Sequence, residues 1–275
     1  MKIEITCPKC QTPLELSASD AELRDRLAAE AKVKNVEFLN QAEKFARNFS
    51  EEGDARALYW SFLAQVQRSS LGVIERFYEY AYVVEKLRGV SGSSILDVGS
   101  AFTTLPSVLA AMGHAVTCLD LREWKMSWPG VQTVKGDLLQ LDAPLPFGVF
   151  DYITCVSTIE HLGLSDRYGG RESVDGDFEG MCALRDHLKS NGRMLLTVPV
   201  GKPAVVYPAH RVYDSSRFSR LISEFHLLDE RYFRRESTTF YLCSREEAYL
   251  TEPIDAKKLS SYSIICCLLE KEVSQ

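Results

Sequence analysis

The sequence lacks several features that would assign it to a common class at once. No apolar run approaches the roughly 20 residues that a membrane-spanning helix needs, and stretches such as 264–269 are far shorter. The first ten residues contain no apolar core of a signal peptide. Basic residues are in deficit, because 32 Lys and Arg face 38 Asp and Glu, for a net charge of −6. We therefore expect a cytoplasmic protein without a membrane span that does not bind nucleic acid.

Internal repeats and low-complexity segments are also absent. The 275 residues are 45% hydrophobic and 25% charged, which is typical of a folded chain with one large domain, or a medium domain with an appendage. The eight cysteines do not indicate a disulfide framework, since several, including Cys118 and Cys155, lie in apolar strand-like runs. We expect reduced thiols that pack as small hydrophobic side chains.

Residues 1–20 are predicted to form a separate short β-hairpin. Cys7 and Cys10 form a C-x-x-C turn between two runs that alternate apolar and polar residues. Such a turn is half of a zinc ribbon, but no second C-x-x-C or H-x₃-H motif follows. Three interpretations stay open: an incidental turn, an intrachain zinc site, and a zinc site shared between two chains.

Residues 21–90 are predicted to form a helical cap or lid. Apolar side chains recur at spacings of three, four and seven, and the stretch 57–87 is rich in Tyr and Phe. An aromatic stripe at this spacing usually packs in a core. Because these helices directly precede the segment that carries the chemistry, we expect part of the stripe to roof a pocket.

Residues 91–275 are predicted to form an α/β domain, because short β-branched runs alternate with amphipathic helices. Strands are expected at 93–99, 114–120, 130–136, 150–157, 192–200, 225–233 and 261–270. Helices are expected at 104–112, 177–189 and 215–223, the second ended by Ser-Asn-Gly. The last two strands are expected to pair antiparallel at the sheet edge.

Small and acidic residues follow the first three of these strands. Asp97-Val-Gly99-Ser-Ala101 forms a turn after the first strand, where parallel sheets bind ligands. Asp120 ends the second strand and is placed to accept hydrogen bonds from ribose hydroxyls, while Asp137 follows the third, near an adenine. A nicotinamide cofactor requires G-x-G-x-x-G, whereas the sequence from Gly99 reads G-S-A-F-T-T. The pyrophosphate would lose its cradle of backbone N–H groups, so this alternative is disfavoured.

The pattern over residues 93–233 resembles class I S-adenosylmethionine-dependent methyltransferases. Asp97 and Gly99 match the first motif of that family, and Ala101 and Thr103 stand where it usually has glycines. The resemblance implies a Rossmann-like, seven-stranded, mostly parallel sheet with an antiparallel last strand, and S-adenosylmethionine as the cofactor. The cofactor-binding residues that it implies are Asp97, Gly99, Ala101, Asp120, Leu121, Asp137, Leu138 and Ser157.

Four further blocks, at 160–170, 175–177, 196–202 and 209–214, are similar to a sparsely characterised branch of these enzymes. That branch is associated with the biosynthesis of glycans or glycosylated metabolites. The similarity implies O-methylation of a sugar or another small hydroxylated acceptor. Candidate acceptor contacts are Arg167, Tyr168, Arg211 and Tyr213, and a surface or packing role remains open for each.

A hydroxyl acceptor loses its proton as the new bond forms, which calls for a general base. Histidine, with an ordinary pKa of about 6.5, suits this role. His161 follows the fourth strand and His210 the fifth, with Glu160 expected to orient one of them or to contact the cofactor. The alternatives are that His161 packs under the cofactor and that His210 bonds to the backbone.

Two acidic residues nearby have two interpretations. Asp175 and Asp177 are placed to cap a helix that begins at Phe178. Together with Glu160 they are also a candidate magnesium site, because hard cations prefer carboxylate ligands.

Two other functions compete with methylation of a small molecule. The first is an RNA or protein methyltransferase that uses Cys7 and Cys10 for recognition, although the acidic composition argues against RNA. The second is a non-catalytic S-adenosylmethionine-binding module, suggested by Ala101 and Thr103. Assembly into a homo-oligomer is compatible with the sequence.

Overall fold

The computed structural model describes residues 3–6, 13–16, 75–101, 103–123, 128–140, 148–164, 169–206, 210–236, 239–252 and 262–272. Strands β1 (Ile3–Thr6) and β2 (Pro13–Leu16) pair antiparallel, with Ile3 opposite Leu16. Cys7 and Cys10 lie outside the described residues, as do residues 21–74 of the expected helical cap. The Cys-containing hairpin, its zinc site and the domain boundaries therefore stay predictions.

The main sheet has eight strands in the order β11-β10-β12-β7-β6-β3-β4-β5. Their bounds are β3 Ser94–Val98, β4 Ala115–Asp120, β5 Val131–Lys135, β6 Phe150–Val156, β7 Leu188–Val200, β10 Phe225–Glu236, β11 Thr239–Cys243 and β12 Ser263–Lys271. Strands β3 to β7 run parallel, and β12 runs antiparallel to both of its neighbours. The chain moves outward from β3 to β5 and then returns to β6, so the strand order reverses between β3 and β6. Ligands of open α/β sheets bind at such a reversal.

This architecture confirms the expected largely parallel α/β sheet with an antiparallel last strand. The strand count is eight and not seven, because the segment between β10 and β12 contributes β11 at the outer edge. Strands β10 and β12 pair antiparallel as expected, but β12 lies inside the sheet between β7 and β10. Its apolar residues Ile264 and Ile265 are both buried, which explains why the run is continuously hydrophobic.

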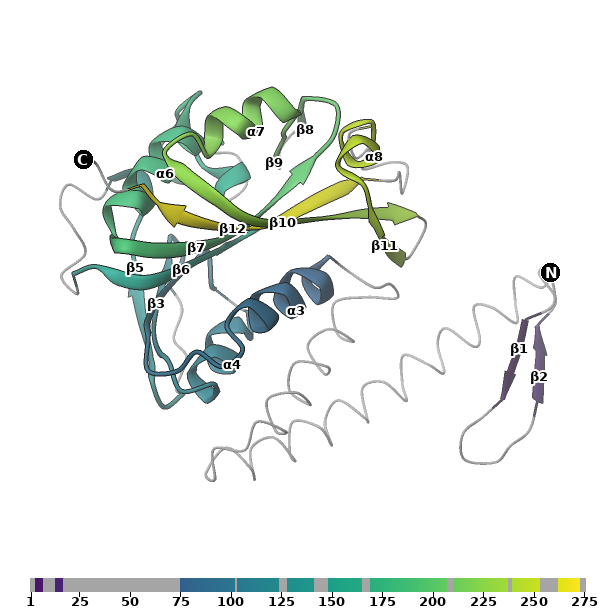
Figure 1. Ribbon diagram of the computed structural model, residues 1–275, viewed down its shortest axis with the longest axis horizontal. Coiled ribbons are helices and arrows are strands. Elements are labelled where there is room, and N and C mark those ends of the chain that lie inside the picture. The colour runs from purple at the N-terminus through teal and green to yellow at the C-terminus, as the bar shows by residue number, and fades with distance from the viewer. Residues whose placement is uncertain are drawn as a thin grey trace.

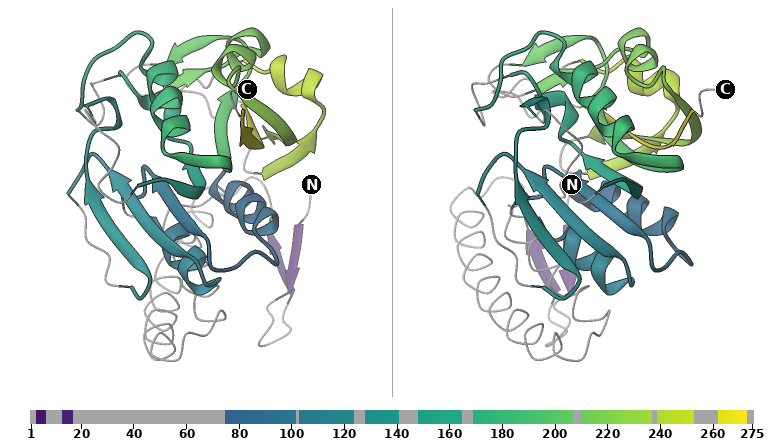
Figure 2. Two further views of the ribbon diagram at one scale, coloured as in Figure 1. Left: turned by 60° about the vertical axis from the view of Figure 1, so that its left-hand side comes forward. Right: turned by 90° about the vertical axis from the view of Figure 1, so that its left-hand side faces the viewer.

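Helices cover both faces of the sheet (Figures 1 and 2). α3 (Arg76–Lys86) and α4 (Leu105–Ala111) lie against one face, and α6 (Gly176–Asp186) and α7 (Ser215–Leu221) lie against the other. Successive residues of the central strand β3 point to opposite sides. Ile95 accordingly packs in the cluster that contains α3 and α4, and Leu96 packs in the cluster that contains α6 and α7.

One helix boundary differs from the sequence expectation. The helix expected at 177–189 ends at Asp186, and β7 begins at Leu188. The Ser-Asn-Gly signal falls inside the extended β7 segment, where Asn191 takes a left-handed conformation with φ of 60°. The pairing of β6 with β7 shifts register near this point, so the turn signal produces an irregularity in the strand and not a helix end.

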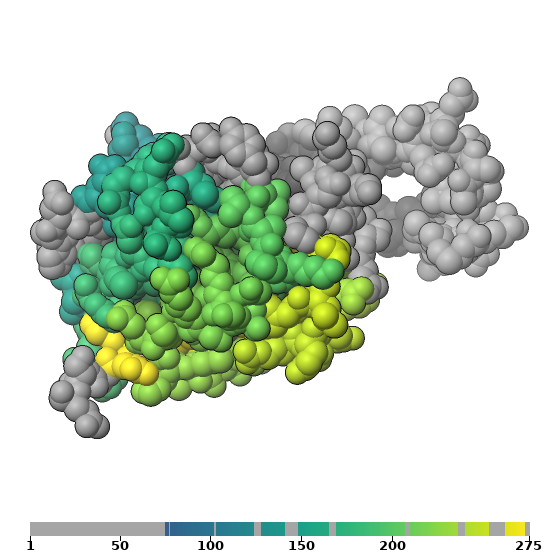
Figure 3. Space-filling model, turned by 90° about the horizontal axis from the view of Figure 1, so that it is seen from above, coloured from purple at the N-terminus to yellow at the C-terminus, as the bar shows by residue number. Residues whose placement is uncertain are grey.

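Several short elements were not expected. β8 (Ala204–Val206) and β9 (His210–Val212) pair antiparallel beyond the end of β7. α8 (Arg245–Tyr249) begins with a capping box in which Ser244 and Glu247 bond each other's backbone N–H, a signal that is readable in the sequence. Seen from above, α8 lies beside the surface formed by α6 and α7 (Figure 3).

Two global expectations concern cysteines and membrane spans. The six cysteines within the described ranges carry free thiols, as expected, and four of them are buried. No helix in the described part of the chain is both long and apolar enough to cross a membrane.

Candidate cofactor-binding and catalytic site

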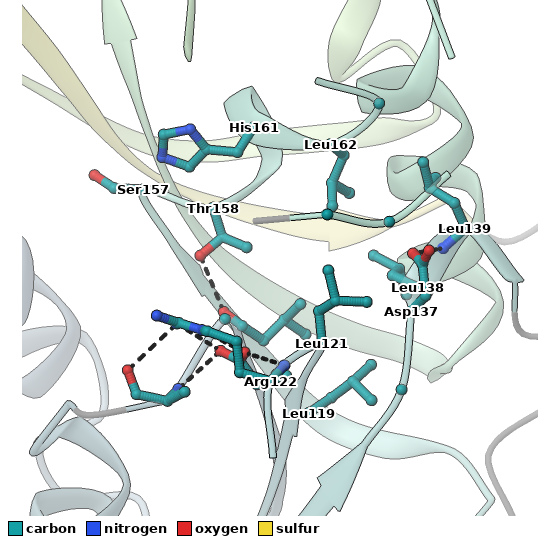
Figure 4. A pocket seen from close by; sticks show the side chains of 18 of the residues that line it. Leu119, Leu121, Arg122, Asp137, Leu138, Leu139, Ser157, Thr158, His161 and Leu162 are labelled. Carbon is teal, nitrogen blue, oxygen red and sulfur yellow. Dashed lines mark hydrogen bonds and ion pairs between the residues drawn. The ribbon is translucent and has the colours of Figure 1, made fainter. Parts of the chain in front are cut away.

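A cavity opens at the carboxyl ends of β3, β4, β5 and β6, where the strand order reverses (Figure 4). Figure 4 shows Ser157, Thr158 and His161 at one end and Asp137, Leu138 and Leu139 at the other. The cavity is also lined by a residue of α3 and by the segment 169–171. The expected cofactor-binding residues that line it are Gly99, Ala101, Asp120, Leu121, Asp137, Leu138 and Ser157.

The turn after β3 depends on Gly99. Gly99 has φ of 76°, and an added Cβ would overlap the side chain of Thr158. The Thr158 hydroxyl lies 3.2 Å from the carbonyl of Val98 and 3.0 Å from that of Val156, so it joins the turns after β3 and β6. Glycine is therefore required both for the backbone conformation and for this close approach.

Asp120 closes β4, and its carboxylate is fully bonded. It accepts the backbone N–H groups of Ala101 and Arg122, both at 2.9 Å, and the Arg122 side chain through Nε at 2.9 Å and Nη2 at 3.0 Å. Burial opposes ionisation, but the hydrogen bonds from Arg122 and Ala101 hold the Asp120 pKa below its ordinary value. The Arg122 side chain is 38% exposed, so this ion pair lies partly in solvent.

Asp97, near the end of β3, is not one of the residues that line the cavity. Its side chain is 3% exposed and accepts a 2.5 Å hydrogen bond from the Thr154 hydroxyl. Burial raises the Asp97 pKa to about 7, the Thr154 bond opposes this shift, Asp120 adds to it, and Arg76 opposes it. Asp97 therefore bonds the neighbouring strand β6 and is not one of the residues that line the cavity.

Asp137 lies at the other end, after β5. It accepts hydrogen bonds from the backbone N–H groups of Leu139 at 3.0 Å and Arg171 at 3.1 Å, which tie the segment 169–171 to the cavity. A Cβ on Gly170 would stand 3.2 Å from Asp137 and 3.3 Å from Leu121. Segment 169–171 therefore lines the end of the cavity at which adenine is expected from the sequence.

The three expected catalytic residues come together beside the cavity. His161 ends a 3₁₀ turn, η2 (Ile159–His161), and its ring lies 6.1 Å from the ring of His210 at 90°. Oε1 of Glu160 lies 3.8 Å from His161 Nε2. Burial raises the Glu160 pKa to about 8, and its Oε2 atom has no hydrogen-bond partner among the described residues. His161 lines the cavity itself.

The residues expected to contact the acceptor are either buried or outside the described residues. Arg167 and Tyr168 lie outside the described residues, and the Tyr213 side chain is fully buried. Arg211 is 4% exposed, and its guanidinium donates to four backbone carbonyls, those of Glu160, Leu162, Ser173 and Val174. These bonds hold the loop that carries His161 against the loop before α6. Burial argues against direct acceptor contact for Arg211 and Tyr213.

The magnesium hypothesis is not supported by the acidic residues. Asp177 is fully buried and is bonded by Arg217, whose Nη2 lies 2.9 Å from both carboxylate oxygens. Asp175 stands at the N-cap of α6 but makes no capping hydrogen bond through its side chain, so capping is not confirmed. Within the described ranges, no three His, Cys, Asp or Glu side chains are grouped as metal ligands.

Sequence reasoning missed Arg76, Glu79 and Arg122. Glu79 of α3 is fully buried and accepts hydrogen bonds from Ser157 at 2.6 Å, Thr197 at 2.7 Å and Arg76 at 2.6 Å. Ser157 has φ of 41°, which is strained for a residue other than glycine. The only local signal was the i,i+3 spacing of Arg76 and Glu79, which many surface helices share.

The chain is similar to one family model and to several solved structures. A family model described as "Caenorhabditis protein of unknown function, DUF268" matches residues 146–259, less than half of the chain. No curated protein matches. Among solved structures, the chain is similar to TehB from Haemophilus influenzae, with 12% identity, 70% of this chain and 62% of that chain covered, and a TM-score of 0.48.

Two other solved structures were determined with ligands. The N-methyltransferase NodS from Bradyrhizobium japonicum, in complex with S-adenosylhomocysteine, is 12% identical over 78% of this chain and 98% of its own, with a TM-score of 0.49. The 1,6-didemethyltoxoflavin N1-methyltransferase from Burkholderia thailandensis is 15% identical over 96% and 97%, with a TM-score of 0.48. At these scores the similarities carry no argument about function, and the fold assignment depends on the strand order described above.

Proposed function

We propose that the chain is an S-adenosylmethionine-dependent methyltransferase that methylates a hydroxyl of a sugar or of another small hydroxylated molecule. The observation that supports it best is the single cavity that joins Gly99, Asp120 and Asp137 to His161. The first three are the residues expected to hold the donor, and His161 is the residue expected to accept the proton.

The described residues fit a donor of this kind. Four residues of the cavity lie at the carboxyl ends of four adjacent strands. They are Asp137 after β5, Asp120 at the end of β4, Gly99 after β3 and Ser157 after β6. Neighbouring strands lie about 4.8 Å apart, so this row spans roughly 14 Å. That length accommodates a base, a sugar and an amino-acid tail placed end to end. In this proposal Asp137 bonds the adenine amino group and Asp120 bonds the ribose.

In this proposal a histidine accepts the proton of the acceptor hydroxyl. When bound, S-adenosylmethionine supplies an already activated methyl group, so the chain must align the acceptor and remove its proton. His161 lies at the cavity surface and is positioned by Glu160 and by the loop that Arg211 holds. His210 lies directly beside it and is the second candidate base.

The alternatives differ from this proposal in the methylated atom, in the absence of transfer, or in the class of acceptor. NodS and the toxoflavin enzyme are N-methyltransferases by name, so oxygen as the methylated atom depends on the glycan-branch resemblance alone. A non-catalytic module would bind the donor and transfer nothing. RNA or protein methylation would require a larger acceptor than a sugar.

The direct test is calorimetry of the full chain with S-adenosylmethionine and S-adenosylhomocysteine. We expect micromolar binding of both compounds, followed by transfer from methyl-labelled donor to members of a panel of sugars and glycosylated metabolites. Absence of binding at millimolar ligand would contradict the proposal. Binding without transfer to any acceptor class would favour the non-catalytic module.

A substitution at Arg122 tests the ribose site. The Arg122 side chain occupies the Asp120 oxygens that the ribose would use. Releasing a partly exposed ion pair of this kind costs about 1 kcal/mol or less. We therefore expect Arg122→Gln to tighten S-adenosylhomocysteine binding by up to about fivefold. Arg245→Gln on α8 is the matched control and should change nothing, and weaker binding by Arg122→Gln would show that Arg122 contacts the ligand.

A further inference from the structure

Helix α3 lies outside the predicted methyltransferase domain, yet its arginine lines the cavity. Arg76 lines the cavity together with Gly99, Thr103 and Ser157. Its Nη1 donates to Glu79 at 2.6 Å, and its side chain is 28% exposed. A guanidinium carries five N–H donors in a planar fork, and the bond to Glu79 uses one of them.

Glu79 fixes the position of this arginine. It is fully buried, and it also accepts the hydroxyls of Ser157 at the end of β6 and Thr197 within β7. Thr197 in turn accepts the backbone N–H of Ser157 at 3.0 Å. The first turn of α3 is therefore attached to the β6 and β7 side of the sheet, and Arg76 has little freedom to move away.

The strand order shows which part of a ligand would meet Arg76. Asp137 and Asp120 follow β5 and β4, on the opposite side of β3 from β6 and β7. A nucleoside whose base and sugar contact these two acids has its remaining substituent at the β6 end, beside Arg76. Asp97 belongs to β3, the strand that lies between β4 and β6.

We infer that Arg76 is a binding residue for the donor, pairing with the carboxylate of its α-amino-acid tail, and that Glu79 is the positioning residue that holds it. The inference rests on the proposed function, since it assumes that the ligand is an adenosyl amino acid. A planar guanidinium matches a carboxylate with two parallel hydrogen bonds, which an ammonium does not. The tail would thus be recognised by a residue of the segment before the parallel sheet.

The test compares two ligands that differ only in the tail. S-adenosylhomocysteine carries the amino acid, and 5′-methylthioadenosine ends in a methyl group. We expect Arg76→Met to weaken S-adenosylhomocysteine binding about tenfold to a hundredfold and to leave methylthioadenosine binding within twofold. Arg88→Met, in the exposed turn just after the C-terminal end of α3, is the matched control and should alter neither affinity.

Arg76→Met leaves the buried Glu79 carboxylate without its cation, so the variant risks unfolding. Arg76→Lys keeps the charge and loses the planar fork, and it should weaken only S-adenosylhomocysteine, by a smaller factor. Equal changes for the two ligands in the folded variant, or no change, would overturn the role of Arg76. A wild-type chain that binds methylthioadenosine as tightly as S-adenosylhomocysteine would also overturn it and leave the proposed function standing. A wild-type chain that binds neither compound would overturn the proposed function itself.

Discussion

Replacing His161 with alanine is expected to lower turnover about 100-fold or more while S-adenosylhomocysteine binding stays within twofold. Loss of a positioned general base costs about 10²–10⁴ in rate. His161 lines the cavity near the end of β6, whereas the expected ribose and adenine contacts follow β4 and β5. Turnover is measured with methyl-labelled donor and an acceptor found in the panel, and affinity is measured by calorimetry.

Two further variants provide a control and a test of the second candidate base. His226→Ala replaces a histidine whose side chain is 65% exposed, and it should leave both quantities unchanged. His210→Ala tests the neighbouring ring. Wild-type turnover in His161→Ala together with a large loss in His210→Ala would transfer the role of base to His210. If both variants turn over normally, neither histidine is the base.

Asp120→Ala is expected to weaken S-adenosylhomocysteine binding by one to two orders of magnitude, or about 1.4–2.7 kcal/mol. Two hydrogen bonds from ribose hydroxyls to a buried carboxylate account for a loss of this size. The carboxylate is 6% exposed, so water would not replace those bonds fully. Calorimetry with the same ligand measures the effect.

Asp120 also accepts two backbone N–H groups, so its removal affects the turn as well as the ligand site. Asp120→Asn keeps the shape and one acceptor oxygen, and it should lose less affinity than Asp120→Ala. Asp186→Asn, at a carboxylate that is 65% exposed, is the control. Unchanged affinity in a folded Asp120→Ala variant would mean that the ribose lies elsewhere in the cavity.

The fold was largely predictable because its signals are local. The parallel strands contain apolar and β-branched runs that the sequence shows directly, and all seven expected strands are present within a few residues. The end of α6 was mispredicted because a left-handed Asn occurs both at helix ends and at irregularities in strands. Here Asn191 lies at an irregularity of β7. Strand β11 lies in the stretch between the last two expected strands, where no further strand was expected, and it pairs with β10 alone.

The site was predictable in part, for a related reason. In a parallel sheet the residues after each strand meet at one edge, so Gly99, Asp120 and Asp137 could be placed together from their positions alone. Arg211 could not be interpreted in this way. Its chemistry suggested an acceptor contact, but its four backbone carbonyl partners come from two loops that only the folded chain brings together.

The sequence by itself determined the α/β class, the row of small and acidic residues along the sheet edge, and the two histidines beside it, because these follow from strand periodicity and from what directly succeeds each strand. Only the tertiary structure decided that the Arg122 side chain bonds the carboxylate of Asp120, that Asp177 is committed to Arg217, and that Glu79 joins α3 to Ser157. These contacts depend on which polar side chains the folded chain buries close to one another. Residue type alone does not determine that.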